Sequence, residues 1–443
     1  MRVGHNSWPY VPNTDVHRQE MLEAIGVQSS DSLFSDIPEQ YRKTTLDLPE
    51  PLSELELRRE LQAISELNLS ANNSPSFLGG GCYHHFVPAV VNHVSSMGGM
   101  LTAYTPYQPE VSQGTLQATY EFQSLVSQLL GMEVANAGMY DGATSFAEAA
   151  LMACRVTGRK RIGILDSVSP AYVSVVRTYA EPQGLDIYLT TQDDPLVNED
   201  TACLLTQHPN YYGYLENLES LETKIHDNGS LFVVATDPIF VGMFKPPGEY
   251  GADIVVAEGQ PLGVAMSYGG PYVGLFTCRT RFLRQMPGRI VGKTEDTKGR
   301  EGYVLTLQTR EQHIRRERAT SNICTSEALI GTLVVSYLAC MGKTGLRHIS
   351  EMTYHNAHYA ASLIADIPGF SLPLNGTFFQ EFIVKCPLPP SIIQRVLLDK
   401  GIICGIDVSE QIENGILICV TEMNTKKEID DLVAAMKSMV GGI

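Results

Sequence analysis

The sequence has no Cys-x-x-Cys pair. Its nine cysteines are an odd number, spread from Cys82 to Cys419. Zinc sites and disulfide frameworks use closer, patterned spacing, so neither is predicted. Most of the cysteines lie in apolar runs such as 417–420, which indicates free, buried thiols in a reducing cytoplasm.

Positive charge and long apolar runs are also scarce. The chain has 32 basic and 49 acidic residues and a net charge of -17, a field that repels nucleic acid and anionic membranes. Its longest apolar stretch, 332–341, is far below the roughly 20 residues that a membrane helix needs. Residues 1–10 contain no apolar segment typical of a signal peptide. We therefore expect a soluble cytoplasmic protein that binds neither nucleic acid nor membranes.

Nucleotide-binding fingerprints are missing as well. No Gly-x-Gly-x-x-Gly run follows a predicted strand, so a dinucleotide fold has no support. Segment 288–294 reads Gly-Arg-Ile-Val-Gly-Lys-Thr, but three residues separate its glycines where a P-loop has four. Pro287 stands where the P-loop needs glycine and offers no N–H. We expect 288–294 to be a solvated loop.

The chain's 443 residues are too many for one hydrophobic core. Residues 1–75 read as an arm of short helices, one of them opened by the capping box Ser53-x-x-Glu56. From 76 to 342, apolar strands alternate with amphipathic helices, which predicts an α/β domain with a mainly parallel sheet. The expected strands are 161–166, 185–190, 231–235, 253–257 and 273–278.

The pattern changes in the last hundred or so residues. A strand at 381–385, a helix at 391–400, a strand at 416–421 and a helix at 426–440 predict a small α+β domain over 343–443. Gly401 ends the first of these helices, and the capping box Thr425-x-x-Glu428 opens the second. A large α/β domain followed by a small α+β domain is one arrangement found in fold-type I pyridoxal-phosphate enzymes, an analogy of architecture only.

Two polar positions suit a cofactor in such a fold. Asp141, Gly142 and Thr144 open an alanine-rich helix whose N–H groups could bind an anion, although a plain N-cap explains them equally well. Asp237 follows the strand 231–235 and could hold a pyridine nitrogen, but an Asp before Pro238 is more often a turn residue.

A lysine is absent from the place where such a cofactor would be attached. Segment 258–274, after the strand 253–257, contains none, so this segment cannot form a Schiff base. Lys245, Lys293 and Lys298 lie in polar or proline-rich segments, and we expect all three to face solvent.

Two polar loops are the remaining candidates. The run Tyr104-Thr-Pro-Tyr-Gln-Pro-Glu110 is stiff and carries hydroxyls and a carboxylate, as binding loops do, although a structural crossover explains it equally well. The run 315–324 places three arginines before Thr320-Ser-Asn322; it suits an anionic partner or a solvated helix end. The pair His84 and His85 does not form part of a patterned set of metal ligands, so no metal site is predicted; we take His84 as a surface variation and leave the role of His85 open.

These stretches together resemble the N-terminal half of the glycine cleavage P-protein. The two most specific runs are Tyr104 to Glu110 and Arg318-Ala-Thr-Ser-Asn-Ile-Cys324. Further matching pieces lie at 10–15, 23–26, 136–150, 245–254 and 258–260. The resemblance covers nearly the whole chain and implies the fold-type I transferase fold. In the split form of that family, only the second subunit carries the lysine, and Gln260 falls in its place here.

The resemblance implies a heterotetramer with two copies of each subunit, in which the partner binds pyridoxal phosphate covalently. The assembled enzyme decarboxylates glycine and transfers the aminomethyl group to the lipoyl arm of H-protein. The residues expected to reach the partner's pocket and act in catalysis are Tyr104, Thr105, Tyr107, Gln108, Glu110, Arg318, Thr320, Ser321 and Asn322. The degenerate cofactor positions of this chain are Asp141, Gly142, Thr144, Asp237 and Gln260.

Two alternatives remain open. The chain could be an autonomous pyridoxal-phosphate enzyme that uses Lys245 or Lys293, which the missing lysine at 260 opposes. It could also be a catalytically inert partner subunit, which the polar loops at 104 and 318 oppose.

Overall fold

The computed structural model describes residues 13–42 and 47–440. The chain forms two compact units, 1–68 and 69–443, each described here by itself. The first unit contains α1 (Asp15–Ile25), α2 (Glu39–Arg42) and α3 (Glu54–Ser65). The predicted capping box is confirmed, because Glu56 Oε2 accepts from Ser53 N at 2.9 Å and Ser53 Oγ accepts from Glu56 N. The apolar stripe of α3, which includes Leu57, Leu61 and Ile64, is exposed among the described residues.

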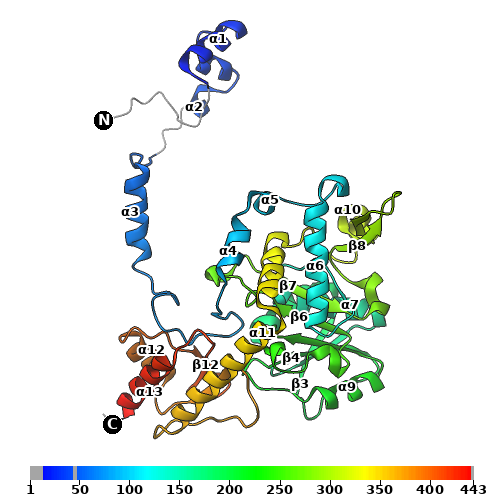
Figure 1. The fold of residues 1–443 in the computed structure, drawn as a ribbon, viewed down its shortest axis with the longest axis vertical. Helices are drawn as coiled ribbons and strands as arrows, with labels where there is room; N and C mark the ends of the chain where they lie inside the picture. Colours follow the sequence, from blue (N-terminus) through cyan, green and yellow to red (C-terminus); the bar gives the residue numbers. More distant parts are fainter. Residues whose placement is uncertain (1–12, 43–46, 441–443) are drawn as a thin grey trace. The chain divides into compact units, whose positions relative to one another are not determined.

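The second unit is built on a seven-stranded sheet of order β1-β7-β6-β5-β4-β2-β3 (Figure 1). Its strands are β1 (Val134–Ala135), β2 (Arg161–Leu165), β3 (Asp186–Thr190), β4 (Thr201–His208), β5 (Leu231–Thr236), β6 (Ile254–Glu258) and β7 (Gly274–Cys278). Strands β3, β2, β4, β5 and β6 run parallel, while β7 and β1 are antiparallel to their neighbours. The five expected strands are therefore confirmed, and β1 and β4 are additional.

Helices bury the sheet in one large apolar core. They are α4 (Ala89–Ser96), α6 (Gln113–Leu129), α7 (Gly142–Thr157), α8 (Pro170–Ala180), α9 (Leu218–Asp227) and α11 (Ala328–Ala365). Two short helices, α5 (Gly98–Leu101) and α10 (Gln312–Arg315), contribute no buried residue. Helix α7 packs along β4 to β7, and its first residue, Gly142, donates to Glu258 at the end of β6. Parallel strands end at a common edge, and ligands of open α/β sheets bind there. The edge brings Asp237, Glu258 and the start of α7 together.

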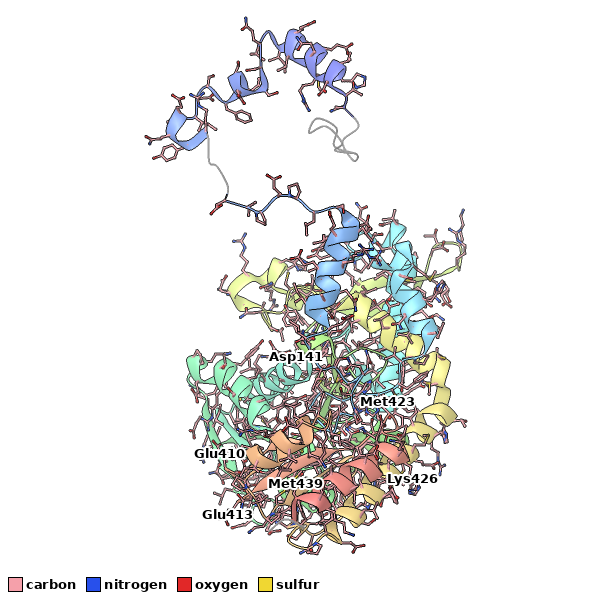
Figure 2. The ribbon with its side chains drawn as sticks, turned by 90° about the vertical axis from the view of Figure 1, so that its left-hand side faces the viewer. Asp141, Glu410, Glu413, Met423, Lys426 and Met439 are labelled. Atoms are coloured by element: carbon pink, nitrogen blue, oxygen red, sulfur yellow. The ribbon has the colours of Figure 1, made fainter. Side chains whose placement is uncertain are left out.

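A smaller antiparallel sheet of order β10-β12-β11 forms a second core with α12 (Pro390–Leu398) and α13 (Lys426–Val440). Its strands are β10 (Glu381–Lys385), β11 (Ile406–Asp407) and β12 (Gly415–Cys419). The box at α13 is present, with Thr425 N donating to Glu428 Oε2 at 2.7 Å. Figure 2 shows Lys426 at the start of α13 and Met439 towards its end.

Helix α11 spans both cores and breaks at Gly342, where φ is 58°. We propose that the boundary between the large and small domains lies at this break. Among the residues described, α11 is the helix long and apolar enough to cross a membrane by length and composition alone. Its packing against α4, α6, α13 and β10 accounts for its apolar faces as protein core.

The expectation for segment 288–294 is wrong. Segment 288–294 is not a loop: β8 (Ile290–Glu295) pairs antiparallel with β9 (Glu301–Thr306) in a separate hairpin. Gln123 of α6 holds β8 by accepting from Val291 N and donating to Val291 O, both at 2.9 Å. Lys293 and Lys298 are exposed, as expected, and so is Lys245.

Candidate active site

The cofactor-like positions meet at the start of α7. Asp141 is the N-cap, and its Oδ1 accepts from Thr144 N at 2.7 Å. Gly142 N donates to Glu258 Oε2, at the end of β6, at 2.8 Å. The N–H groups of the first and third helical residues are thus bound to carboxylates of the chain itself. Sequence reasoning did not select Glu258, because the helix start that it binds lies 116 residues away along the chain.

Asp237 forms the turn after β5. Its Oδ1 accepts from Ile239 N at 2.7 Å and from Phe240 N at 3.3 Å, while Oδ2 accepts from Gln380 Nε2 at 2.6 Å. Burial raises the pKa of Asp237, against the opposing effects of His85 and these hydrogen bonds.

Gln260 is 1% exposed and fully hydrogen-bonded. Its Oε1 accepts from Tyr83 N at 3.0 Å, and its Nε2 donates to Tyr83 O and Val264 O, both at 2.9 Å. The amide therefore fastens segment 79–85 to the chain after β6. Its chemistry is structural, since an amide is no nucleophile and both its N–H groups are occupied.

A cavity of about 50 Å³ lies among these residues. Asp237, Glu258 and Glu381 contribute carboxylates to its lining, which contains no Lys or Arg. Glu381 accepts from Gly80 N at 2.6 Å and from the Tyr83 hydroxyl at 2.8 Å. Burial raises the pKa values of Glu258 and Glu381 to about 7 each. These residues do not fit the phosphate group of pyridoxal phosphate, because they present three acidic groups and no cation.

These carboxyls predict that stability falls as pH rises from about 5 to 8. In the folded state they keep protons that the unfolded chain releases near the ordinary value of 4.5, so ionisation favours unfolding. Burial lowers the pKa of His208 to about 4. This shift makes stability rise with pH, but only below about pH 6.5. Chemical denaturation across this range should show a loss on the order of a few kcal/mol, smaller in the E258Q/E381Q double variant. A pH-independent difference between the two proteins would contradict this.

His85 is buried beside this region and paired with Glu422. His85 Nδ1 lies 2.7 Å from Glu422 Oε2, and their side chains are 1% and 6% exposed. Burial lowers the pKa of His85, but Glu422, together with Asp237 and Gln380, outweighs this effect, so the pKa is raised overall. His84 is half-buried rather than on the surface. Within 13–42 and 47–440, no group of three or more His, Cys, Asp or Glu is placed to hold a metal.

The two polar loops lie apart from this cavity and close to each other. In the first, Tyr104 and Tyr107 are 74% and 61% exposed, and Gln108 and Glu110 are exposed as well. Buried Arg289 anchors the loop: its Nη1 lies 3.5 Å from Thr105 Oγ1 and its guanidinium 5.6 Å from the Tyr107 ring centroid. Exposed tyrosines on an anchored loop are suited to contact another chain.

The second loop is fixed to α7. Ser321 Oγ donates to Glu148 Oε1 at 2.6 Å, and Cys324 N donates to the Tyr140 hydroxyl at 3.2 Å. Arg318 and Asn322 are exposed, while Thr320 lines both a small cavity beside Arg289 and a groove of about 820 Å³. Ser321 is thus engaged within the chain, and Arg318, Thr320 and Asn322 are accessible.

Arg289 and Glu311 connect the loops. Arg289 Nε lies 3.2 Å from Glu311 Oε2, each side chain being 8% exposed. Arg289 and Ser326 line both the cavity beside Tyr104 and the cavity beside Thr320. Arg289 sits in the segment that resembles a P-loop, which obscured its role in the sequence.

Comparison with known proteins identifies the family. The family profile described as Glycine cleavage system P-protein matches residues 9–436. The probable glycine dehydrogenase (decarboxylating) subunit 1 of Chlorobium limicola is 46% identical over 442 residues, 97% of this chain and 100% of that protein. The protein of the same description from Thermomicrobium roseum is 46% identical over 97% of this chain and 99% of its own length.

Solved structures agree. A crystal structure of glycine decarboxylase (P-protein) of the glycine cleavage system, in inhibitor-bound form, superposes with a TM-score of 0.91 and 41% identity, covering 97% of this chain and 100% of that one. The glutamate decarboxylase of Lactobacillus brevis shares the fold alone, with a TM-score of 0.66 and 14% identity over 92% of this chain and 97% of its own. The predicted fold-type I transferase class is confirmed. The chain belongs to the P-protein family of the glycine cleavage system.

Proposed function

We propose that this chain is the subunit of a two-part glycine dehydrogenase (decarboxylating) that does not itself bind pyridoxal phosphate. The observation that carries this is Gln260, a fully hydrogen-bonded amide at the position after β6 where the cofactor's lysine is expected. The partner subunit then holds the cofactor covalently, in a cytoplasmic heterotetramer with two copies of each chain. The assembled enzyme decarboxylates glycine and passes the aminomethyl group to the lipoyl arm of H-protein.

In this assembly, the loops 104–110 and 318–322 complete the partner's pocket. The accessible groups on them are aromatic, hydroxyl, amide and guanidinium groups, which can orient a small zwitterion and its carboxylate. Arg318 is the cation suited to a carboxylate or phosphate, since its side chain is 85% exposed and pairs only loosely with Glu317, at 3.9 Å. Arg289 contacts the first loop at Thr105, and Glu148 contacts the second at Ser321.

The first test is the absorbance between about 380 and 450 nm of the purified chain with added pyridoxal phosphate, before and after borohydride reduction. We expect no Schiff-base band, no pyridoxyl-lysine peptide, and glycine decarboxylation only after the partner subunit is added. A band with label on Lys245 or Lys293 would make the chain an enzyme in its own right.

A second test separates a catalytic subunit from an inert one. The Y107A/T320A double variant, assembled with the partner, should lose about 10-fold or more of its kcat/KM, because both groups are accessible on the loops. The matched control is K427A, an exposed residue of α13. Unchanged activity of the double variant, with normal assembly, would favour the inert-partner alternative.

A further inference from the structure

The most unusual feature of the cofactor-like region is the carboxyl group of Glu258 at the start of α7. The start of a helix attracts negative charge because its first N–H groups are unpaired and its dipole is positive there. In this chain Glu258 Oε2 takes the N–H of Gly142, and Asp141 Oδ1 takes that of Thr144. Figure 2 shows Asp141 within the folded second unit, away from its C-terminal helix. The anion site of α7 is therefore filled by carboxylates from the protein.

The space beside Gly142, the first residue of α7, is also filled. A Cβ built on Gly142 would collide with the Tyr172 hydroxyl and with the side chain of Glu258. Glu258 is held on its other oxygen as well, where Oε1 accepts from Gln260 N at 3.0 Å. The carboxylate is thus clamped between the start of α7 and the chain after β6.

The charge of the cavity also opposes the binding of a phosphate group. Asp237 and Glu381 line the same space as Glu258, and no lining residue is basic. A phosphate group in this cavity would face these acids without any Lys or Arg to compensate them. At the short separations inside a small cavity, such like-charge contacts are screened poorly by solvent.

We propose that Glu258 occupies the place of the cofactor phosphate, so that this subunit excludes pyridoxal phosphate and similar phosphoesters independently of the missing lysine. Without the lysine, the cofactor cannot be attached covalently. With Glu258 in place, its phosphate group cannot bind non-covalently at the start of α7. The carboxylate also serves the fold, because it caps α7 and fastens it to β6. This inference concerns the isolated chain and goes beyond the role proposed for the assembled enzyme.

Pyridoxamine phosphate and inorganic phosphate are suitable probes. Neither can react with surface lysines, so any binding is non-covalent. We expect no saturable binding of pyridoxamine phosphate to the wild-type chain up to about 1 mM in equilibrium dialysis. We expect inorganic phosphate to raise the melting temperature of E258S by several degrees more than that of the wild type, because the Gly142 N–H becomes free.

Two matched variants separate position from charge. E258Q keeps an oxygen in front of Gly142 N, so it should gain no phosphate stabilisation. E381Q removes one charge from the same cavity but not from the helix terminus, and it should also gain none. Circular dichroism of each variant establishes that it is folded.

Three results would overturn the inference. One is submillimolar binding of pyridoxamine phosphate to the wild type, a measurement that needs no variant. The second is an equal phosphate effect in E381Q and E258S, which would assign the exclusion to net charge alone. The third is a folded E258S that gains nothing from phosphate. The outcome is independent of glycine decarboxylation by the assembled enzyme, so failure here leaves the proposed function in place.

Discussion

Replacing Glu422 by alanine is expected to lower the free energy of unfolding by about 3–5 kcal/mol. Glu422 is 6% exposed at its side chain and is held by three donors. Its Oε2 lies 2.7 Å from His85 Nδ1 and accepts from Thr353 Oγ1 at 3.1 Å, and its Oε1 accepts from Phe86 N at 2.7 Å. Removing the carboxylate leaves the buried imidazole without the group that stabilises its charged form.

The pH dependence of this loss identifies its cause. Burial raises the pKa of Glu422, but His85 and the hydrogen bonds to this carboxylate outweigh that effect, so the pKa is lowered overall. The ion pair therefore contributes stability above about pH 4.5. The pKa of His85 is raised overall, so its contribution is complete below about pH 6.5 and is lost as pH rises through the folded value. The difference between wild type and E422A should therefore be largest near pH 6 and shrink in alkaline solution.

Urea or guanidinium denaturation at several pH values measures this difference. The matched control is E413A: Glu413 is 85% exposed and lies 3.8 Å from Lys385, so its removal should change stability by less than about 1 kcal/mol. Figure 2 labels Glu413 at the far side of the small domain from Asp141. An E422A loss that is the same at pH 6 and pH 9 would exclude the charged His85 pair as its source.

The regular elements of both units were predictable because their patterns are local. A few consecutive residues are enough to predict each of these elements: five strands of the main sheet, the two C-terminal helices and the capping boxes at Ser53 and Thr425. Strand β4 (Thr201–His208) was not predicted, although it is buried over most of its length. It carries polar threonines and a glutamine, which an apolar-run criterion overlooks in a buried parallel strand.

The site was harder to predict because its contacts are long-range. Arg289, Glu311, Glu148 and Glu381 were not selected, and each acts through a partner distant in sequence, such as Ser321 for Glu148. The hairpin β8–β9 was misread for a related reason. Its glycine and lysine suggest a loop locally, while its partner strand and Gln123 of α6 decide its conformation. Tertiary context overrides local propensity at such positions.

The second large effect is expected at Arg289. We predict that R289M lowers the kcat of the assembled enzyme by about 100-fold, since a displacement of about 1 Å in a positioning group can cost that much. Arg289 contacts Thr105 at 3.5 Å and stacks against Tyr107 on one side, and it pairs with Glu311 at 3.2 Å on the other. Its removal disconnects the loop 104–110 from the segment that leads to Thr320. The prediction rests on the proposal that these loops complete the partner's pocket.

Arg289 also stabilises the fold, so the variant series must separate the two roles. R289M removes the closest cation of buried Glu311 and leaves only His313 Nδ1, at 3.5 Å, a change expected to cost up to about 3–5 kcal/mol. The double variant R289M/E311L removes both charges and should recover much of that stability. It should recover none of the activity, because Thr105 and Tyr107 still lack their anchor.

R289K provides the sharper comparison. A lysine can pair with Glu311 but cannot also reach Thr105 and lie against Tyr107, because it lacks the planar, forked guanidinium. We expect R289K to be nearly as stable as the wild type and to keep its KM within about threefold, with kcat still reduced at least 10-fold. The control R300M alters an exposed arginine at the tip of the neighbouring hairpin, paired locally with Asp296, and should leave both constants unchanged. If activity follows stability across R289M, R289M/E311L and R289K, Arg289 is a core ion pair and the loops do not depend on it. If activity stays low while stability returns, the guanidinium is the positioning group that holds both loops against the partner's pocket.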